Sequence, residues 1–285
     1  MNILITGASG YIGRNLKERL ETKYRLYIPK HKELDLLDEI AVENFFRKKN
    51  IDVVIHAAVV GGSRQEEQEN KMFYESLRMF FNIVRNKKYF KKMIHLGSGA
   101  EYDKRFPIRK IKEEDFDKRV PVDDYGYYKY LCSKYIENTE GIVSLRIFGL
   151  FGKYEDYRYR FISNAICRNI FGLPITINKD VYFDYLYIED FLKIVEYFIE
   201  NDGEYKFYNI GTGKPINIAK LAKKINRIAR DKSKIIIKNK GLGNEYTCDN
   251  SRLLKEIKNL SFTNIDEAIK KVYDWYTKNK KQIKK

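Results

Sequence analysis

The amino-terminal stretch Asn2-Ile-Leu-Ile-Thr6, followed by Gly7-Ala-Ser-Gly-Tyr-Ile-Gly13, decides the fold. Its first five residues form a short apolar run typical of a buried parallel strand, and a helical pattern begins at Tyr11. The glycines stand at the turn between the two. The first permits a tight turn, the second lets the backbone approach a pyrophosphate, and the third lets the helix pack close to the strand. We therefore predict a dinucleotide-binding βα unit here, rather than a glycine-rich turn that holds no ligand.

Further short apolar runs alternate with helical patterns through the first half of the chain. We predict strands at residues 2–6, 24–28, 52–56, 92–96 and 142–147, and helices at 11–20, 39–49, 65–86 and 125–138. This alternation is typical of an α/β fold in which a doubly wound parallel (Rossmann) sheet has helices on both faces. After Gly152 the regularity weakens. There we expect helices at 161–171, 190–200, 217–228 and 265–276, and extended segments at 174–177, 183–187 and 206–210.

These elements predict two parts of the chain. Residues 1–152 and 181–212 form the expected dinucleotide-binding core, and residues 153–180 and 213–285 form a smaller, carboxy-terminal substrate-binding lobe.

Length, charge and cysteine content narrow the class of protein. The 285 residues contain 55 Lys and Arg against 39 Asp and Glu, a net charge of +16. This excess favours an anionic partner, and a phosphorylated small molecule is preferred over a nucleic acid because no nucleic-acid-binding motif accompanies the charge. No apolar run approaches the ~18 residues of a membrane span. The chain begins without a signal-peptide pattern, so we expect a cytoplasmic protein. Cys132, Cys167 and Cys248 lack metal-ligand spacing, and no metal site is predicted.

The end of the second strand bears on the choice of dinucleotide. An acidic side chain there binds ribose hydroxyls, whereas a basic one favours a 2′-phosphate. The stretch runs Ile28-Pro-Lys-His-Lys-Glu33, and Arg14 follows the last glycine. We therefore favour NADP over NAD; the alternative is that these charges are solvated and Glu33 binds the ribose. Further on, Asp35 or Asp38 would reach the adenine amino group, although Asp38 equally suits a helix N-cap.

Two other segments of the sequence contain three candidate catalytic residues. Tyr125 and Lys129 stand at positions i and i+4, which lie on one face of a helix. A nearby ammonium stabilises a phenolate, so Tyr125 is a candidate acid or base for a carbonyl/alcohol couple. Ser98 comes just after an apolar strand, at the edge where doubly wound folds bind ligands. The alternatives are a buried helix aromatic for Tyr125 and a structural turn serine for Ser98.

Six motifs in this order resemble the extended short-chain dehydrogenase/reductases that act on nucleotide sugars (NAD-dependent epimerase/dehydratase type). They are TGASGYIG at 6–13, HAA at 56–58, SGAEY at 98–102, YGYYK at 125–129, LRIFGLFG at 145–152 and FDYLYIED at 183–190. The likeness covers about residues 1–215. It implies that Tyr125 donates or accepts the proton, that Lys129 binds the nicotinamide ribose and tunes Tyr125, and that Ser98 holds the reacting oxygen. The expected cofactor-binding residues are Gly7, Ser9, Gly10, Tyr11, Ile12, Gly13, Arg14, Lys30, His31, Asp35, Leu36, Ala57, Ala58, Tyr125 and Lys129.

Departures from the family pattern narrow the reaction. Sugar dehydratases carry an Asp-Glu pair where this chain has Gly99 and Ala100, and Glu101 falls one residue too late, so dehydration is disfavoured. The motifs of the chain are similar to those of the GDP-fucose synthases of this family. However, Ala100 stands where those enzymes have the cysteine that epimerises the sugar. The resemblance therefore implies NAD(P)H-dependent reduction of the 4-keto group of a nucleotide-linked 4-keto-6-deoxy sugar, used in surface-polysaccharide sugar synthesis. A 4-epimerase with tightly bound NAD, or a regulator that binds ligands without turnover, remain the alternatives.

The expected substrate is a nucleotide-diphosphate sugar. Ser98 and Gly99 would contact its sugar, and Arg158, Arg160 and Arg168 would bind its diphosphate, unless they are solvated helix arginines. Gly149 and Phe183 replace the asparagine and arginine usual in the later motifs. Aromatic residues on several faces of the helices near 72–81 and 127–135 favour a homodimer, since the corresponding helices pair in the family; the alternative is that they only pack on the sheet.

Overall fold

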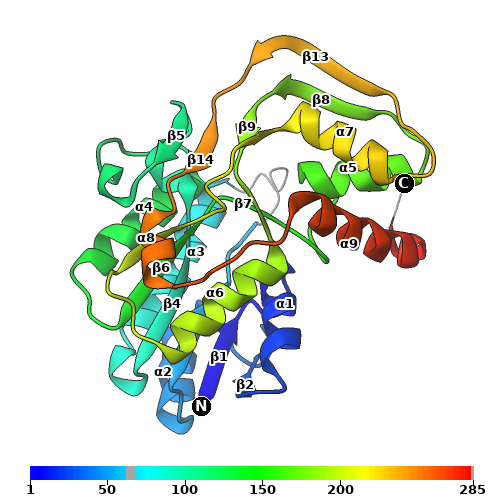
Figure 1. The fold of residues 1–285 in the computed structure, drawn as a ribbon. Coiled ribbons are helices and arrows are strands. Elements are labelled where there is room, and N and C mark those ends of the chain that lie inside the picture. The colour runs from blue at the N-terminus through cyan, green and yellow to red at the C-terminus, as the bar shows by residue number, and fades with distance from the viewer. Residues whose placement is uncertain (62–68, 284–285) are drawn as a thin grey trace. The chain divides into compact units, whose positions relative to one another are not determined.

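A computed structural model describes residues 1–61 and 69–283 of the chain. The chain divides into two compact units (Figure 1). Unit 1 consists of residues 1–103, 113–147 and 192–209, and unit 2 of residues 104–112, 148–191 and 210–285. Each unit is described separately below.

A six-stranded sheet forms the centre of unit 1. Its strands lie in the order β11–β6–β4–β3–β1–β2, with β1 at Asn2–Thr6, β2 at Arg25–Tyr27, β3 at Val53–His56, β4 at Lys92–Ser98, β6 at Ile142–Ile147 and β11 at Phe207–Ile210. The pairs β1–β2, β1–β3, β3–β4 and β4–β6 are parallel. The predicted doubly wound fold is therefore confirmed. Because the chain runs from β1 to one side and then returns to the other, the ligand-binding edge of such a sheet lies where β1 and β3 end.

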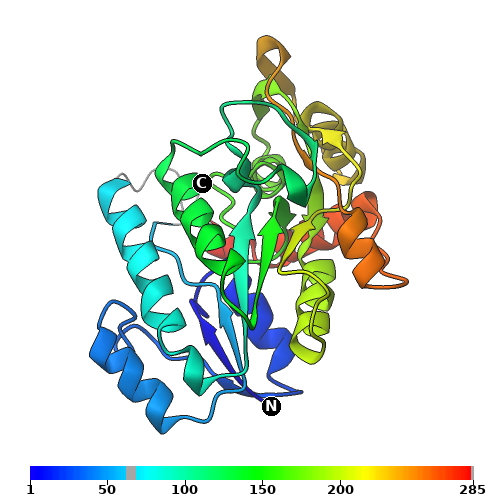
Figure 2. The same ribbon diagram turned by 90° about the vertical axis from the view of Figure 1, so that its left-hand side faces the viewer.

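Helices cover both faces of this sheet (Figures 1 and 2). They are α1 (Tyr11–Leu20), α2 (Glu39–Lys48), α3 (Glu69–Val84), α4 (Asp124–Glu137) and α6 (Ile188–Glu200). Helices α2, α3 and α4 bury Phe46, Phe80 and Tyr128 against sheet residues such as Val54 and Met93. On the other face, α1 and α6 are joined by ion pairs. The carboxylate of Glu196 lies 2.7 Å from Arg19 and 2.5 Å from Lys23.

The predicted bounds of these elements agree closely with the structure, with one exception. The helix predicted over residues 65–86 is described only from Glu69, and its first residues lie outside the described part of the chain. Short 3₁₀ helices complete the set: η1 (Lys87–Tyr89), η2 (Gly99–Tyr102) and η3 (Glu113–Asp115) in unit 1, and η4 (Lys280–Gln282) in unit 2. Within residues 1–61 and 69–283, no helix is both long and apolar enough to cross a membrane.

The described part of unit 2 contains three small sheets, four complete α-helices and the first residues of α6. The sheets are β10–β7, β12–β9–β14–β5 and β13–β8. Their strands are β5 (Ile108–Ile111), β7 (Gly149–Phe151), β8 (Ile175–Asp180), β9 (Tyr182–Phe183), β10 (Tyr185–Tyr187), β12 (Ile216–Asn217), β13 (Ile235–Leu242) and β14 (Tyr246–Cys248), and the helices are α5 (Phe161–Ile170), α7 (Ile218–Ile228), α8 (Ser251–Glu256) and α9 (Ile265–Lys278). Helices α5, α7 and α9 share one core, to which they contribute Ile166, Leu221 and Ile269.

Candidate active site

The glycine-rich turn between β1 and α1 has the geometry that its sequence predicts. Gly7 has a φ of +68°, and a Cβ there would lie 2.7 Å from the Cα of Ala58, which follows β3. A Cβ on Gly13 would lie 2.2 Å from the carbonyl oxygen of Gly7. Side chains are therefore excluded at both positions. Gly10 is the N-cap of α1, and its own Cβ position is not crowded, so a phosphate can approach the first amides of the helix.

A buried histidine ties the ends of β1 and β3 together below this turn. The Nδ1 of His56 lies 2.8 Å from the Oγ1 of Thr6, and the amide of Ala58 donates to the same hydroxyl at 3.3 Å. Burial lowers the pKa of His56 to about 3, and the positive charge of Lys129 adds to this effect. The imidazole is therefore neutral at physiological pH. The backbone around Ala57 and Ala58 is thus fixed by a neutral hydrogen bond.

The loop after β2 contains the basic residues Lys30, His31 and Lys32. The carboxylate of Glu33 accepts a hydrogen bond from the backbone amide of Lys30 at 2.7 Å, which fixes the loop. Asp38 caps α2 by accepting from the amides of Ile40 and Ala41, each at 3.0 Å. The N-cap alternative for Asp38 is therefore correct.

Two other predicted cofactor residues stabilise local turns near the same edge of the sheet. Asp35 accepts from the amide of Leu37 at 2.9 Å, and Arg14 donates from Nε to the carbonyl oxygen of Ser9 at 2.8 Å. Leu36 is buried, whereas His31 is exposed. These side chains and the open Gly10 turn fit a dinucleotide whose pyrophosphate lies at the start of α1.

Ser98 ends β4 and begins η2. Its Oγ accepts a hydrogen bond from the amide of Ala100 at 3.1 Å, and the carboxylate of Glu101 accepts from the amide of Ser98 at 2.8 Å. This reciprocal arrangement is a capping box, which the spacing Ser-x-x-Glu predicts but which our sequence reasoning missed. Because the Oγ acts as acceptor for Ala100, its own proton remains able to point toward a ligand oxygen. Ser98 is thus both a turn residue and a usable donor.

Lys129 reaches the same end of β4 from α4. Its Nζ donates to the carbonyl oxygen of Leu96 at 2.6 Å and lies 5.9 Å from the ring centre of Tyr125. The first turn of α4 packs directly on η2, since a Cβ on Gly126 would lie 2.9 Å from the carbonyl oxygen of Ala100. The structure therefore places Tyr125 and Lys129 close to η2, the 3₁₀ helix whose N-cap residue is Ser98.

Tyr125 differs from its neighbour Tyr128, the other phenol close to Lys129. Tyr128 is fully buried, and its hydroxyl lies 3.5 Å from the Nζ of Lys129. Burial raises the pKa of Tyr128 well above its usual value. By contrast, Tyr125 is partly exposed. Of these two phenols, Tyr125 is the one that a substrate can reach.

A buried ion pair lies under Ser98. Glu101 is 0% exposed and Arg146 is 1% exposed, and the Nε of Arg146 donates to the carboxylate at 2.8 Å. Ser133 donates to the same carboxylate oxygen at 2.6 Å. The guanidinium of Arg146 also stacks on Phe116 and Phe207, 4.2 and 4.3 Å from their ring centres. Glu101 is therefore fully engaged in the protein interior, and it fixes the backbone of Ser98 rather than facing a substrate.

The three arginines predicted to bind a diphosphate lie in unit 2. Arg158 is paired with the carboxylate of Asp156 through Nε at 2.9 Å and Nη2 at 2.8 Å. Arg168, in the last turn of α5, donates from Nε to the carbonyl oxygen of Pro174 at 2.5 Å. Arg160 is the N-cap residue of α5. Two of the three guanidinium groups thus already have protein partners.

A doubly wound sheet with this glycine turn and with a serine, tyrosine and lysine gathered at one strand end defines a dinucleotide-dependent oxidoreductase. Comparison with known proteins specifies the family. Residues 3–211 match the NAD dependent epimerase/dehydratase family, and the chain belongs to it. It is an NAD(P)-dependent enzyme of the extended short-chain dehydrogenase/reductase type, as predicted.

Individual relatives are similar over nearly the full chain. GDP-L-colitose synthase from Yersinia pseudotuberculosis is 23% identical, with 98% of this chain and 99% of that protein covered. A GDP-D-glycero-L-gluco-heptose synthase from Campylobacter jejuni, solved in the presence of NADPH, has a TM-score of 0.83 at 19% identity over 96% of this chain and 98% of that one. UDP-glucose 4-epimerase from Thermotoga maritima, solved with UDP-glucose, has a TM-score of 0.82 at 20% identity. The match covers 98% of this chain and 99% of that one.

Proposed function

We propose that the protein reduces the 4-keto group of a nucleotide-linked 4-keto-6-deoxy sugar. The observation that carries the proposal is the gathering of Ser98, Tyr125 and Lys129 at the end of β4, without the epimerising or dehydrating group of related enzymes at positions 99–101. Position 100 is alanine, and Glu101 is held by Arg146 and Ser133. Such a set suffices to polarise and protonate one carbonyl oxygen.

In the proposed step, a carbonyl becomes a secondary alcohol. A reduced nicotinamide cofactor supplies the hydride to C4. Ser98 donates a hydrogen bond to the C4 oxygen and orients it, and Tyr125 gives its phenolic proton to that oxygen as the C–O double bond becomes single. Lys129 stabilises the phenolate that remains until solvent returns a proton.

Several observations support finer parts of the proposal. The basic residues Arg14, Lys30 and His31 favour NADP over NAD, because a 2′-phosphate needs positive partners. In this scheme the predicted core, residues 1–152 and 181–212, holds the dinucleotide, and Arg158, Arg160 and Arg168 of the predicted lobe bind the nucleotide sugar. Two of the similar proteins are named for GDP-linked sugars, so GDP-linked substrates are the first to test.

An assay of the purified protein tests the reaction. Given a panel of GDP-, UDP- and dTDP-linked 4-keto-6-deoxy sugars, we expect one equivalent of NADPH to be consumed per substrate, faster than NADH, as followed by reduced-nicotinamide absorbance. An isomerised product without net cofactor consumption would instead establish a 4-epimerase. Binding without any turnover across the panel would favour the regulator and contradict the reductase.

A homodimer is the second part of the proposal. Four aromatic side chains of α3 and α4 in unit 1 remain exposed, namely Tyr74 (59%), Phe81 (38%), Tyr127 (38%) and Tyr135 (37%). Phe81 contacts Tyr135 edge to face, with ring centres 5.2 Å apart. The two helices lie side by side (Figure 2), so Phe81 and Tyr135 form a joint apolar surface that a second copy of the chain would cover.

Phe81→Glu should convert the dimer to a monomer, because the new carboxylate would be buried without a partner at the interface. Sedimentation equilibrium measures the change in mass. Phe106→Glu, in unit 2 and of similar exposure (41%), is the matched control and should leave the dimer intact. A wild-type monomer, or a Phe81→Glu protein of unchanged dimeric mass, would refute the proposed interface.

A further inference from the structure

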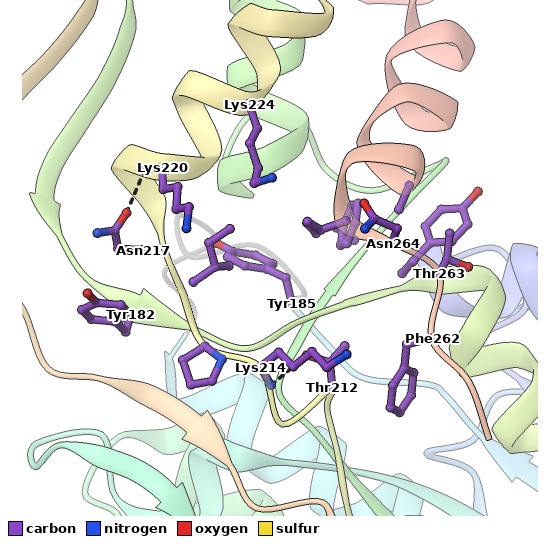
Figure 3. A pocket seen from close by; sticks show the side chains of 16 residues that line it. Tyr182, Tyr185, Thr212, Lys214, Asn217, Lys220, Lys224, Phe262, Thr263 and Asn264 are labelled. Carbon is purple, nitrogen blue, oxygen red and sulfur yellow. Dashed lines mark hydrogen bonds between the residues drawn. The ribbon is translucent and has the colours of Figure 1, made fainter. Parts of the chain in front are cut away.

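Unit 2 contains a cavity of about 450 Å³ that none of the predicted catalytic, cofactor or substrate residues lines. Its walls come from β7, β9, β10, the loop that follows β11, the start of α7 and the segment that leads into α9. Tyr185 lies at its centre, with Lys220 and Lys224 extending toward it from α7 and Lys214 on the opposite side (Figure 3). This volume is in the range of small-ligand sites, ~300–1,000 Å³.

The lining carries positive charge that the protein does not neutralise. Lys214, Lys220 and Lys224 line the cavity, whereas no aspartate or glutamate does. The Nζ of Lys224 lies 2.6 Å from the carboxylate of Asp266, which compensates its charge. Lys214 and Lys220 are exposed, and neither forms an ion pair within residues 1–61 and 69–283. Two uncompensated ammonium groups on opposite walls therefore favour an anion between them.

Side chains, and not helix amides, are the donors available to that anion. At the start of α7, the amide of Ile218 donates to the carbonyl oxygen of Val181 at 3.1 Å, and the amide of Ala219 donates to the carboxylate of Asp180 at 3.0 Å. The Lys220 amide is bonded to the side chain of Asn217 at 2.8 Å. Because these amides have partners, an anion at this site is bound by the lysine ammonium groups, which make strong charge-assisted hydrogen bonds to phosphate.

Aromatic side chains also line the cavity. Tyr182, Tyr185 and Tyr187 from β9 and β10 line the cavity together with Phe151 and Phe262. The ring of Tyr185 is supported edge-on by Phe151, with centres 6.2 Å apart, and Tyr182 is 37% exposed. An exposed aromatic face beside a cationic site suits a ligand that joins a planar ring to a phosphate.

We propose that this cavity is a second ligand site, which binds a nucleoside diphosphate with its phosphates between Lys214 and Lys220 and its base on the tyrosine wall. The proposal goes beyond the reductase function, because it uses no residue assigned to the reaction. The bound nucleotide comes either from free nucleoside diphosphate or from the nucleotide part of a sugar nucleotide, which share this chemistry.

Isothermal titration calorimetry of the full chain with GDP, UDP, pyrophosphate and guanosine tests the site. Relative to wild type, Lys214→Ala/Lys220→Ala should weaken diphosphate binding at this site about 10- to 100-fold, as expected when charged hydrogen bonds are lost. If the substrate site also binds GDP, the wild-type protein should bind two equivalents of GDP, and Lys214→Ala/Lys220→Ala should bind one. The matched control Lys223→Ala/Lys234→Ala removes one exposed α7 lysine and one exposed loop lysine outside the cavity, and should bind as wild type does.

Three outcomes would overturn the proposal: unchanged GDP binding by Lys214→Ala/Lys220→Ala, equal weakening by the control pair, or pyrophosphate binding as tight as GDP, which would exclude the base contact. Circular dichroism melting checks that each variant folds. The Tyr125→Phe protein should retain the site, so loss of turnover and loss of this binding are separable. Competition by GDP-mannose distinguishes a site open to sugar nucleotides from one restricted to free diphosphates.

Discussion

Tyr125→Phe should lower kcat about 100- to 10,000-fold, the usual contribution of a positioned general acid, and leave NADPH binding intact. The change removes one oxygen from a partly exposed side chain in the first turn of α4, so it leaves the packing of Gly126 on η2 unaltered. Stopped-flow reduction of the substrate found in the panel assay measures the effect, and fluorescence titration measures the affinity for NADPH.

Two neighbouring tyrosines on α4 provide matched controls for Tyr125. Tyr127→Phe removes an exposed hydroxyl and should change kcat little. Tyr128→Phe removes a buried hydroxyl that lies 3.5 Å from the Nζ of Lys129. If the loss of kcat in Tyr125→Phe came only from a change at Lys129, Tyr128→Phe would also lower kcat. If Tyr125→Phe retains wild-type turnover, the proton comes from another group and the proposed reaction step is wrong.

The parts of the site that sequence predicts are those formed by local spacing. The Gly7–Gly13 turn and the helix from Tyr11 to Leu20 follow from a pattern within a dozen residues, and their steric reasons are visible in the structure. Tyr125 and Lys129 share a helix, so their proximity is also local. The carboxyl edge of β4 was predictable because parallel strands all end at one edge of the sheet.

The strands of unit 2 that were missed lack such a local signal. β13 carries mainly exposed residues in its second half and pairs with β8, about sixty positions away. β5 and β14 pair with each other across more than 130 residues. β5 and β14 are too short to show an apolar run or an alternation, and the apolar run that opens β13 does not continue into its exposed second half.

The ion pair between Glu101 and Arg146 beneath Ser98 could not be predicted either, because its two residues are far apart in the sequence. Sequence analysis placed Glu101 out of register for dehydration, and the structure gives the reason. Its carboxylate is turned inward to Arg146, 45 positions away, and to Ser133. Nothing in the spacing of Glu101 and Arg146 predicts their contact. Likewise, nothing in the sequence spacing predicts that Lys214 and Lys220 line one cavity with Phe151 and Phe262.

The pair between Glu101 and Arg146 leads to the largest stability effect that we expect. Arg146→Met should lower the free energy of unfolding by roughly 3–5 kcal/mol, because it leaves the Glu101 carboxylate buried without its charged partner. Urea denaturation followed by circular dichroism measures the loss. Arg109→Met is the control, since Arg109 is 75% exposed in its pair with Glu245, and exposed pairs contribute under about 1 kcal/mol.

Adding Glu101→Gln to Arg146→Met should restore part of that stability, because the amide removes the unpaired charge yet retains a carbonyl oxygen for the amide of Ser98. Comparison of the single and double variants then separates the effect of the unpaired Glu101 charge from the effect of losing the Arg146 side chain. If the network also positions Ser98, Arg146→Met lowers kcat with little change in the KM for NADPH, and the double variant recovers some turnover. A stability loss no greater than that of Arg109→Met would mean that water or a rearranged side chain compensates Glu101, and Arg146 would then have no structural role under the active site.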